Sequence, residues 1–369
     1  MLSNSRFVPI AIMRLPWVPM LLVLTIGSFG ALTLYSVAGG PWALKHLFRM
    51  LMLLGMAIFI SRLKPRLFRD LTYPIYGSLI VALIAVQLFG SVRNGARSWF
   101  NLGLFEFQPS EPMKPVLVLA LASFYASVPA KYMRSFHAVW PAVLIMLLPT
   151  LLILIQPDLG TALLLVFSSL TIMFMAGLPL RLFLIGGIAV GAALPAIYNY
   201  ALLPHQRDRV SIFLNPEQDP LGTGYHIIQS KIAIGSGGLF GKGFLHGSQS
   251  HLHFLPEPET DFIVPAMMEE LGLVGLSFLM ICFFLLFRWG MNVAGASNDR
   301  FSKLTAIGLI MTIFFYFAIN MLMVTGLAPV VGIPLPLFSH GGSAMLTTML
   351  CIGILMSIDR ENRGFGREL

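Results

Sequence analysis

The run FIVPAMMEELGLVGLSFLMICFFLLF occupies residues 262–287 and decides the fold. A helix needs about 20 predominantly apolar residues to cross the hydrocarbon core of a bilayer, and this run exceeds that length. Its only charged side chains are Glu269 and Glu270, near its beginning. We therefore interpret the run as a membrane-spanning helix.

The rest of the chain has the same apolar character. The 369 residues are 57% hydrophobic and 11% charged, with a mean hydropathy of +0.82. Soluble domains carry roughly 25% charged residues, so this chain is too apolar to cover itself with polar surface. The sequence predicts an all-α, polytopic integral membrane protein of about ten transmembrane helices, at 17–37, 43–61, 73–90, 111–128, 137–155, 159–178, 181–201, 262–287, 303–325 and 334–358. The first span is too long for the core of a signal peptide.

The net charge of +8 indicates topology rather than nucleic-acid binding, because the basic residues flank apolar runs. With the N-terminus inside, the inner segments hold most lysines and arginines, and the short outer segments hold only Lys45, Arg49, Arg93, Arg97 and Lys114. The asymmetry predicts that both termini are cytoplasmic and that residues 202–261 form a long extracytoplasmic loop. The inner set is Arg6, Arg14, Arg62, Lys64, Arg66, Arg69, Lys131, Arg134, Arg181, Arg288, Arg300, Lys303, Arg360, Arg363 and Arg367.

The long loop carries structure of its own. Residues 225–234 are typical of an amphipathic helix on the membrane surface. The glycine-dense segment 235–243 lacks the spacing of a phosphate-binding P-loop, since Ser236 and Gly243 stand where Gly and Ser or Thr are needed. It is either a flexible turn or a backbone cradle for an anion.

Three acidic residues, Glu257, Glu259 and Asp261, end the loop just before the apolar run. Thr260 or Asp261 could cap the following helix, or Asp261 could serve as a base at the membrane boundary. Glu269 and Glu270 lie deeper, where ionisable groups pair with a basic side chain or face a cavity.

A second polar group opens the fourth span. Ser110 is a plausible N-cap, and Glu111 and Lys114 are three residues apart, so they share a helix face. They form either a local ion pair or, with the helix dipole, part of a phosphate site. Asp158 is expected to cap the sixth span.

Together, these segments predict a mixed outer surface suited to a phosphate-bearing lipid or to a transporter gate. Its candidate binding residues are Arg93, Arg97, Lys114, Arg207, Arg209, Lys231, Lys242, Glu111 and Glu257, beside Asp261. His246, His251 and His253 are weak evidence for a metal site. Cys282 and Cys351 lie in apolar runs and give no disulfide or metal pattern.

Several motifs, in order along nearly the whole chain, resemble one family. They are 95–99 (GARSW), 108–111 (QPSE), 156–161 (QPDLGT), 225–238 (YHIIQSKIAIGSGG), 260–263 (TDFI), 269–272 (EELG), 332–336 (GIPLP) and 341–343 (GGS). The chain is similar to the shape, elongation, division and sporulation (SEDS) family, and more to its RodA-type elongation members than to the FtsW division members.

The resemblance implies one membrane domain over residues 1–369 with ten helices, in the bacterial cytoplasmic (inner) membrane. It implies a peptidoglycan glycosyltransferase that polymerises lipid II at the outer face, with a class B penicillin-binding protein as partner. The essential aspartate of the family corresponds to Asp261. Two positions depart from the family: Val264-Pro265 follows the aspartate motif, and His340 replaces an expected tyrosine.

On this reading Asp261 accepts a proton from the acceptor sugar, and undecaprenyl pyrophosphate leaves with inversion at the donor sugar. Arginine and lysine side chains, or a divalent cation such as Mg²⁺ or Mn²⁺ at an unknown site, would stabilise the leaving group. Two alternatives remain: a lipid II flippase or other transporter, and a non-catalytic scaffold for the penicillin-binding protein.

Overall fold

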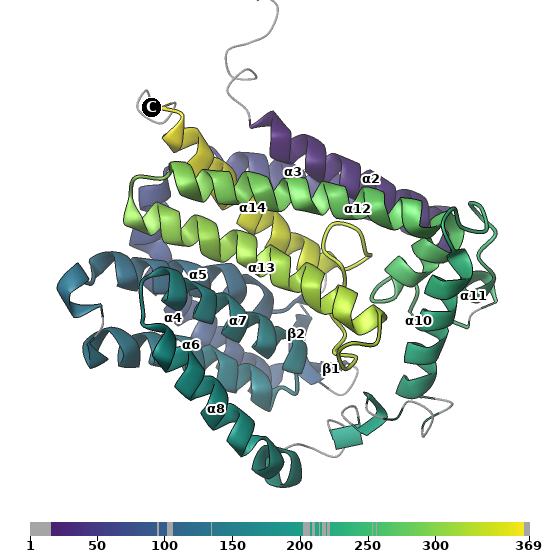
Figure 1. The fold of residues 1–369 in the computed structure, drawn as a ribbon. Helices are drawn as coiled ribbons and strands as arrows, with labels where there is room; N and C mark the ends of the chain where they lie inside the picture. Colours follow the sequence, from purple (N-terminus) through teal and green to yellow (C-terminus); the bar gives the residue numbers. More distant parts are fainter. Residues whose placement is uncertain are drawn as a thin grey trace, which may run out of the picture.

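The computed structural model describes residues 16–93, 96–101, 106–133, 135–201, 207–208, 211–213, 215, 219, 222–252, 254–255 and 257–364. Within these residues the chain forms ten helices of 17 residues or more, gathered into one bundle (Figure 1). They are α2 (Trp17–Ala38), α3 (Gly40–Ile60), α4 (Pro65–Phe89), α5 (Ser110–Ser127), α6 (Phe136–Ile155), α7 (Leu159–Met175), α8 (Leu180–Ala196), α12 (Ile263–Ala296), α13 (Arg300–Val324) and α14 (Gly342–Asn362). Each overlaps one predicted span, which confirms the helical, polytopic architecture.

Eight of these helices, among the described residues, are long and apolar enough to cross a membrane. The other two are α7, with 17 residues, and α5, which carries Glu111 and Lys114 in its first turns. The number of membrane crossings therefore stays a prediction.

Two predicted helix starts are wrong. The helix expected at 73–90 begins at Pro65. Proline is favourable at the first helical position, and the helix therefore includes polar turns that precede the apolar run. The helix expected at 334–358 begins at Gly342. Pro334 and Pro336 bias the residues before them away from helix, so this segment enters the bundle as an extended loop.

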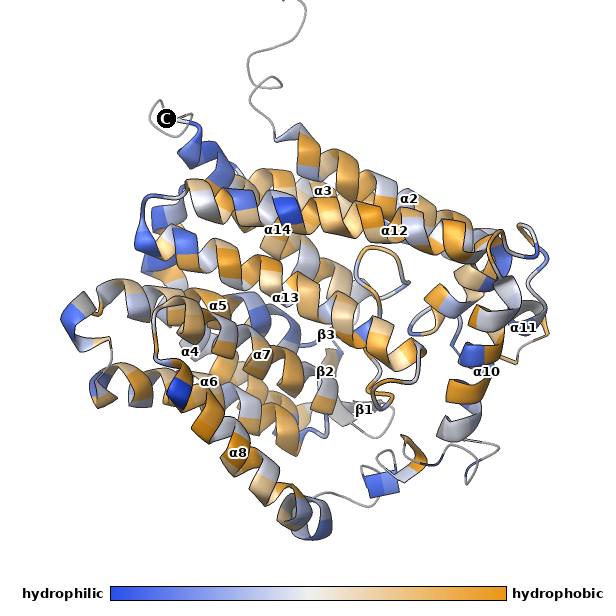
Figure 2. Cartoon of the chain, viewed as in Figure 1, coloured by the Kyte–Doolittle hydropathy of each residue, from blue (hydrophilic) through white to orange (hydrophobic). Residues whose placement is uncertain are grey.

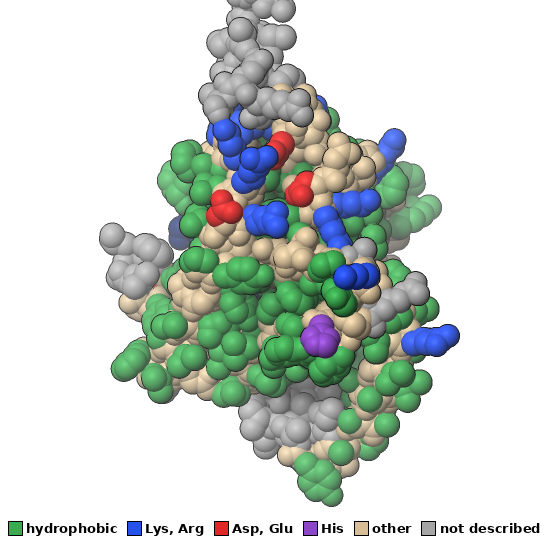
Figure 3. Space-filling model, turned by 90° about the vertical axis from the view of Figure 1, so that its left-hand side faces the viewer, with side chains coloured by type: hydrophobic (Ala, Val, Ile, Leu, Met, Phe, Trp, Pro, Cys, Tyr) green, Lys and Arg blue, Asp and Glu red, His purple; other side chains and the backbone are tan. Residues whose placement is uncertain are grey.

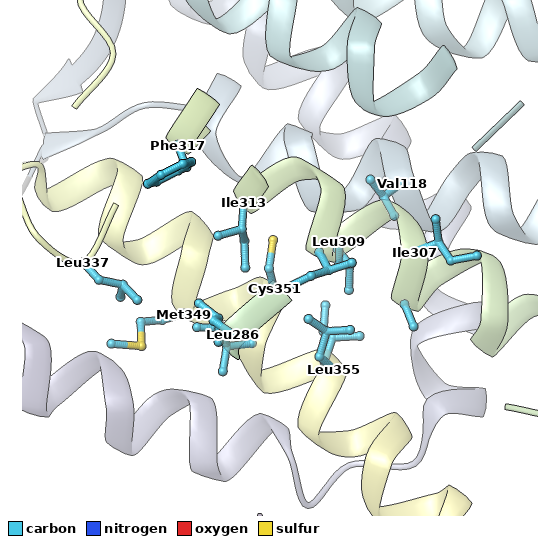
Figure 4. Close-up of a cluster of buried hydrophobic side chains, with 14 of the residues drawn as sticks. Val118, Leu286, Ile307, Leu309, Ile313, Phe317, Leu337, Met349, Cys351 and Leu355 are labelled. Atoms are coloured by element: carbon cyan, nitrogen blue, oxygen red, sulfur yellow. The ribbon is translucent and has the colours of Figure 1, made fainter. Parts of the chain in front are cut away.

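The most buried of the long helices are α5, α13 and α14, which pack against one another at the centre of the bundle. Figure 4 shows side chains from different helices meeting there, including Leu286, Leu309 and Cys351. Cys282 and Cys351 are both buried, and neither forms a disulfide. Hydrophobic residues run along most of the helices in Figure 2. Many of them are exposed, Phe89 by 80%, as expected of helices that face lipid.

Close helix contacts depend on small residues, as is usual where lipid offers no hydrophobic drive for helix association. A Cβ on Gly353 of α14 would lie 3.0 Å from the carbonyl oxygen of Ala57 on α3. A Cβ on Gly30 of α2 would lie 2.3 Å from the carbonyl oxygen of Phe338. The backbone before α14 is therefore packed directly on α2.

Helix α12 is discontinuous. Gly272 has φ 63° and ψ −156°, so the regular helix stops there and resumes. The loop inserts at this break: Lys242 and Gly243 donate backbone bonds to the carbonyls of Glu269 and Glu270, at 2.9 and 3.0 Å. Leu273 and Val274 donate in turn to the carbonyls of Gly238 and Leu239. The inserted segment thus replaces the helical hydrogen bonds that α12 loses.

The glycine-dense segment is explained by this insertion rather than by flexibility. A Cβ on Gly237 would lie 1.9 Å from the carbonyl oxygen of Met268, and one on Gly241 would lie 2.0 Å from that of Glu270. Only residues without a side chain allow the two backbones to approach this closely.

We expect Gly237→Ala to lower the thermal stability of the detergent-solubilised protein, because its Cβ would displace the backbone of α12. Overpacking of this kind costs about 1–3 kcal/mol, occasionally more. Gly235→Ala is the matched control: it lies in the same helix, and nothing lies within 4 Å of its added Cβ. Equal melting temperatures for the two variants would contradict the insertion.

Within the described residues, the predicted loop 202–261 includes the helices α10 (Thr223–Gly237) and α11 (Ser248–His251). Helix α10 covers the predicted amphipathic segment and packs on α12 and α13 through Ala233, which is fully buried with Phe262 and Met323. Ser230 donates a 2.6 Å bond to the carbonyl of Val324 at the end of α13. The loop is thereby fixed to the same end of the bundle as the start of α12.

Candidate active site

A cavity of about 380 Å³ opens at this end of the bundle. Six segments line it: the strand at 96–101, the start of α5, the α6–α7 turn with the first residues of α7, residues 257–261, α13 through Tyr316, and the loop between α13 and α14 with the first turn of α14. Its ionisable side chains are Glu111, Lys114, Asp158, Glu257, Asp261 and Tyr316. The structure therefore brings together four of the residues selected from the sequence: Asp261, Glu257, Glu111 and Lys114.

Asp261 lies just before α12, which begins at Ile263 with Phe262 at the N-cap and without a side-chain capping bond. The alternative interpretation of Thr260 or Asp261 as a cap is therefore wrong. The hydroxyl of Thr260 donates instead to Glu257, 3.2 Å from Oε2. Pro265 falls in the first turn of α12, where proline is tolerated.

Asn320 positions the Asp261 backbone, and Gly332 lies beside its carboxylate. Asn320 of α13 donates from Nδ2 to the carbonyls of Asp261, at 3.1 Å, and Ile333, at 2.7 Å. Gly332 has φ 71°, and a Cβ there would lie 3.5 Å from Oδ2 of Asp261. The carboxylate is partly exposed and lines the cavity.

We expect Asn320→Leu, which is similar in size but has no donor, to leave both carbonyls without this bond. Removing one partner from buried polar groups costs about 1–3 kcal/mol of stability. We also expect any activity that depends on Asp261 to slow, since the loop that carries Asp261 is no longer tied to α13. Thermal melting and an activity assay on the same preparation check both effects, and a variant unchanged in both would refute this role of Asn320.

Glu111 and Lys114 form the predicted ion pair on one face of α5, with Nζ 2.7 Å from Oε1. Both are buried. Tyr316 of α13 accepts a bond from Lys114 and donates to Glu111 Oε2 at 2.8 Å, and Thr347 of α14 donates to the same oxygen at 2.5 Å. This four-residue network joins three helices beneath the cavity.

The predicted cap of α5 is wrong, and that of α7 is confirmed. Pro109 is the N-cap of α5, and the Ser110 hydroxyl is buried without a partner. Asp158 accepts from the backbone N–H of Thr161 at 3.0 Å, as expected for an N-cap. Nε2 of Gln108 donates to the other carboxylate oxygen of Asp158 at 3.4 Å, and both Gln108 and Asp158 line the cavity.

A small antiparallel sheet, which the sequence interpretation missed, lies between α4 and α5. It consists of β1 (Ser91–Arg93), β2 (Ala96–Asn101) and β3 (Glu106–Phe107), in the order β1-β2-β3. We expected only a short loop there, although Asn94-Gly95 between the first two strands is a strong hairpin signal. Strand β2 brings Ser98 and Trp99 to the cavity wall.

The remaining cations do not line the cavity, as far as the described residues show. Lys242 pairs with Glu269 at 2.5 Å, and Lys231 is exposed on α10 against Gly326. Arg207 is described but is not a lining residue. The candidate binding residue Arg209, with the side chains of Arg93 and Arg97, lies outside what the structure describes.

Glu269 binds the loop and Glu270 bonds to α2, and neither lines the Asp261 cavity. Glu269 accepts from Lys242, from the backbone and hydroxyl of Ser248, and from the backbone of Gln249. Glu270 accepts a 2.5 Å bond from Ser36 on α2. The buried-pair interpretation of Glu269 is therefore correct, and it accounts for Lys242 as its partner. Among the described residues, no group of three or more metal-binding side chains gathers, and His253 lies outside them.

Tyr316, Thr347 and Asn320 are site residues that the sequence interpretation missed. Each is a polar residue within an apolar span, which is the signal that could have drawn attention to it. Nothing in the sequence indicates which distant carboxylate or carbonyl it contacts.

The fold and the cavity define a polytopic membrane protein with a charged site at one end of its helical bundle. The profile of the FtsW, RodA and SpoVE family, described as cell cycle protein, matches residues 6–364. The chain therefore belongs to this family, the SEDS family, and within it resembles the RodA type.

Individual relatives cover almost the whole chain. The peptidoglycan glycosyltransferase MrdB of Escherichia coli K12 is 41% identical over 95% of both chains. The peptidoglycan glycosyltransferase RodA of Treponema pallidum is 34% identical and covers 92% of this chain and 96% of its own.

Solved structures agree with the fold. A chain of a peptidoglycan synthase complex that coordinates polymerization and crosslinking matches with a TM-score of 0.82 and 33% identity, over 94% of this chain and 98% of that one. The crystal structure of Thermus thermophilus RodA matches with a TM-score of 0.70 and 29% identity, over 94% and 97%.

Proposed function

We propose that this protein is a peptidoglycan glycosyltransferase that polymerises lipid II into glycan strands during cell elongation, with Asp261 as general base. Its activity is that of the relatives MrdB and RodA. The observation that carries the assignment of the site is the partly exposed carboxylate of Asp261 in a cavity with Lys114 and Glu257.

In the proposed reaction, Asp261 accepts the proton of the 4-hydroxyl on the acceptor N-acetylglucosamine. That oxygen attacks the anomeric carbon of the donor N-acetylmuramic acid while the bond to undecaprenyl pyrophosphate breaks, so the configuration inverts. One base suffices, because the diphosphate leaving group needs charge stabilisation more than it needs a proton. The paired carboxylates of glycoside hydrolases are therefore not required.

Lys114 supports the site indirectly in this proposal. Its ammonium already bonds to Glu111 and Tyr316, so it fixes the floor of the cavity rather than extending into it. Glu257, which is exposed at the rim, is placed to orient the acceptor sugar.

A divalent cation, Mg²⁺ or Mn²⁺, remains a proposal. Mg²⁺ is often held by one or two carboxylates together with substrate phosphates, so Asp261 or Glu257 and a diphosphate would fit without a larger protein cluster. Bound there, the cation would stabilise the charge on the leaving group.

We propose that the cavity faces the outside of the bacterial cytoplasmic membrane and that both termini are cytoplasmic. Figure 3 shows lysine and arginine side chains on the opposite end of the bundle, together with some acidic ones. Arg66, Arg69 and Arg363 line a polar cavity of about 810 Å³ at that end. An excess of basic residues is expected on the cytoplasmic side.

A transporter remains the second candidate because α12 is interrupted at Gly272, beside two acidic residues. Broken helices are typical of transporter sites. Here, however, the inserted loop satisfies the interrupted backbone and Glu269 is paired with Lys242.

Polymerisation of lipid II in detergent separates these functions, since no compartments exist there. The purified chain would be combined with a class B penicillin-binding protein, the partner that we propose, whose transpeptidase serine is inactivated. We expect glycan strands on a gel. A flippase or a scaffold would yield none, and that result would refute the proposed function.

A further inference from the structure

A group of basic residues lies outside the Asp261 cavity, at the same end of the bundle. It consists of Lys45, His46 and Arg49 on α3, with His340 just before α14. The rings of His46 and His340 are 6.4 Å apart, and Trp42 packs edge-on against His340 at 4.7 Å. We call Lys45, His46, Arg49 and His340 the α3 basic cluster.

The charge of this cluster is not neutralised within the described chain. Neither Lys45 nor Arg49 forms an ion pair with a described carboxylate, and Lys45 instead contacts the ring of Trp42, 5.8 Å from its centroid. Burial, then the charge of Arg49, then that of Lys45 lower the pKa of His340 to about 4, with no acidic group acting against them. Nδ1 of His340 is buried and has no hydrogen-bond partner among the described residues.

Arg49 is placed where a cation is least favourable. A Cβ on Gly342 would lie 2.6 Å from Nη1 of Arg49, so the guanidinium lies directly against the first residue of α14. A helix N-terminus carries partial positive charge and unpaired N–H groups, and it attracts anions. No side chain caps this one. A cation and a helix N-terminus that face one another are both stabilised by an anion between them.

The surroundings indicate that the anion belongs to a lipid. Exposed apolar side chains flank the basic residues along α3: Leu44, Phe48, Leu51 and Met52 are 57–73% exposed. Phe48 and Met52 follow Lys45 and Arg49 by three residues and therefore share their helix faces. A headgroup at the cluster would leave its hydrocarbon chain along this apolar surface.

We propose that Lys45, Arg49 and His340, with the first turn of α14, bind the phosphate of a membrane lipid. Lys45 and Arg49 supply positive charge, while neutral His340 and the N–H groups of the turn donate hydrogen bonds. The same turn also lines the Asp261 cavity, through Gly341, Ser343 and Ala344. The first turn of α14 therefore separates the bound phosphate from Asp261. Two lipids carry this chemistry: a polyprenyl diphosphate and a glycerophospholipid.

Native mass spectrometry of the full chain in detergent micelles tests the site without requiring turnover. The probes are undecaprenyl diphosphate, dioleoylphosphatidylglycerol and, as a phosphate-free lipid, undecaprenol. We expect both phosphate lipids to bind more tightly than undecaprenol. Since a charge-assisted hydrogen bond is among the stronger ones, we expect Arg49→Gln to weaken phosphate-lipid binding by about tenfold or more.

The matched control is Arg288→Gln, which removes an exposed arginine elsewhere on the bundle. The Lys45→Gln/His340→Gln double variant tests the site again without altering Arg49. The proposal is overturned if both cluster variants bind as wild type, or if Arg288→Gln weakens binding as much as Arg49→Gln.

The two phosphate probes identify the source of the ligand. A preference for undecaprenyl diphosphate that Arg49→Gln abolishes supports a subsite for the lipid of the proposed reaction. Equal, Arg49-dependent binding of both probes supports a phospholipid headgroup site. Because no glycan is measured, failure here is distinct from failure of the proposed polymerase function.

Discussion

Replacing Asp261 by asparagine is expected to lower the rate of lipid II polymerisation by about 10²–10⁴-fold, the usual contribution of a general base. The amide keeps the size of the side chain and its place between Gly332 and the cavity, but it cannot take up the proton of the acceptor hydroxyl. The purified protein with its penicillin-binding partner would be assayed for glycan strands in detergent.

The control is Glu259→Gln, the same chemical change two residues away. Glu259 is not among the lining residues of the cavity, and its backbone carbonyl, which the substitution keeps, accepts a 2.9 Å bond from the N–H of His340. We expect this variant to polymerise at nearly the wild-type rate. Normal polymerisation by Asp261→Asn would rule out Asp261 as the base, whereas equal losses in both variants would indicate damage to the loop.

Replacing Lys114 by methionine is expected to destabilise the protein by about 3–5 kcal/mol, the range for removing one partner of a buried ion pair. Glu111 would remain with its two hydroxyl donors, Tyr316 and Thr347, but without a compensating charge. The effect would be measured as the free energy of unfolding in mixed micelles, or as a fall in the thermal midpoint.

Two further variants separate charge from packing. Adding Glu111→Gln to Lys114→Met removes the stranded charge and should recover much of the loss. Arg363→Gln breaks the pair with Asp359, in which Arg363 is 53% exposed, and should cost about 0–1 kcal/mol. If Lys114→Met were as mild as Arg363→Gln, the network would not be a structural element of the bundle.

Much of the fold follows from local sequence. Each of the ten long helices overlaps an apolar run, because a chain in lipid must satisfy its backbone hydrogen bonds within each segment. Likewise, the Glu111–Lys114 pair and the Asp158 cap depend on residues three apart, and helix geometry alone brings them together. Such features can be predicted because partner and distance are fixed within one element.

The parts that were missed depend on residues far apart in the sequence. The break in α12 looks helical locally, and only the insertion of residues 238–243 explains the backbone of Gly272. In the same way, the sequence makes Lys242 a candidate substrate-binding cation, whereas in the structure it is paired with Glu269. Charge composition predicts how many cations lie near an end of the bundle, but not which of them is already neutralised.

The sequence by itself determined that this is a helical membrane protein of the SEDS family and that Asp261 stands at the beginning of a membrane helix. Only the packing of separate segments brings Asn320 to the carbonyl of that aspartate, Tyr316 and Thr347 to Glu111, and Arg49 to the start of α14. The physical reason is that apolar length and helical spacing act within one segment, whereas a cavity exists only where several segments meet.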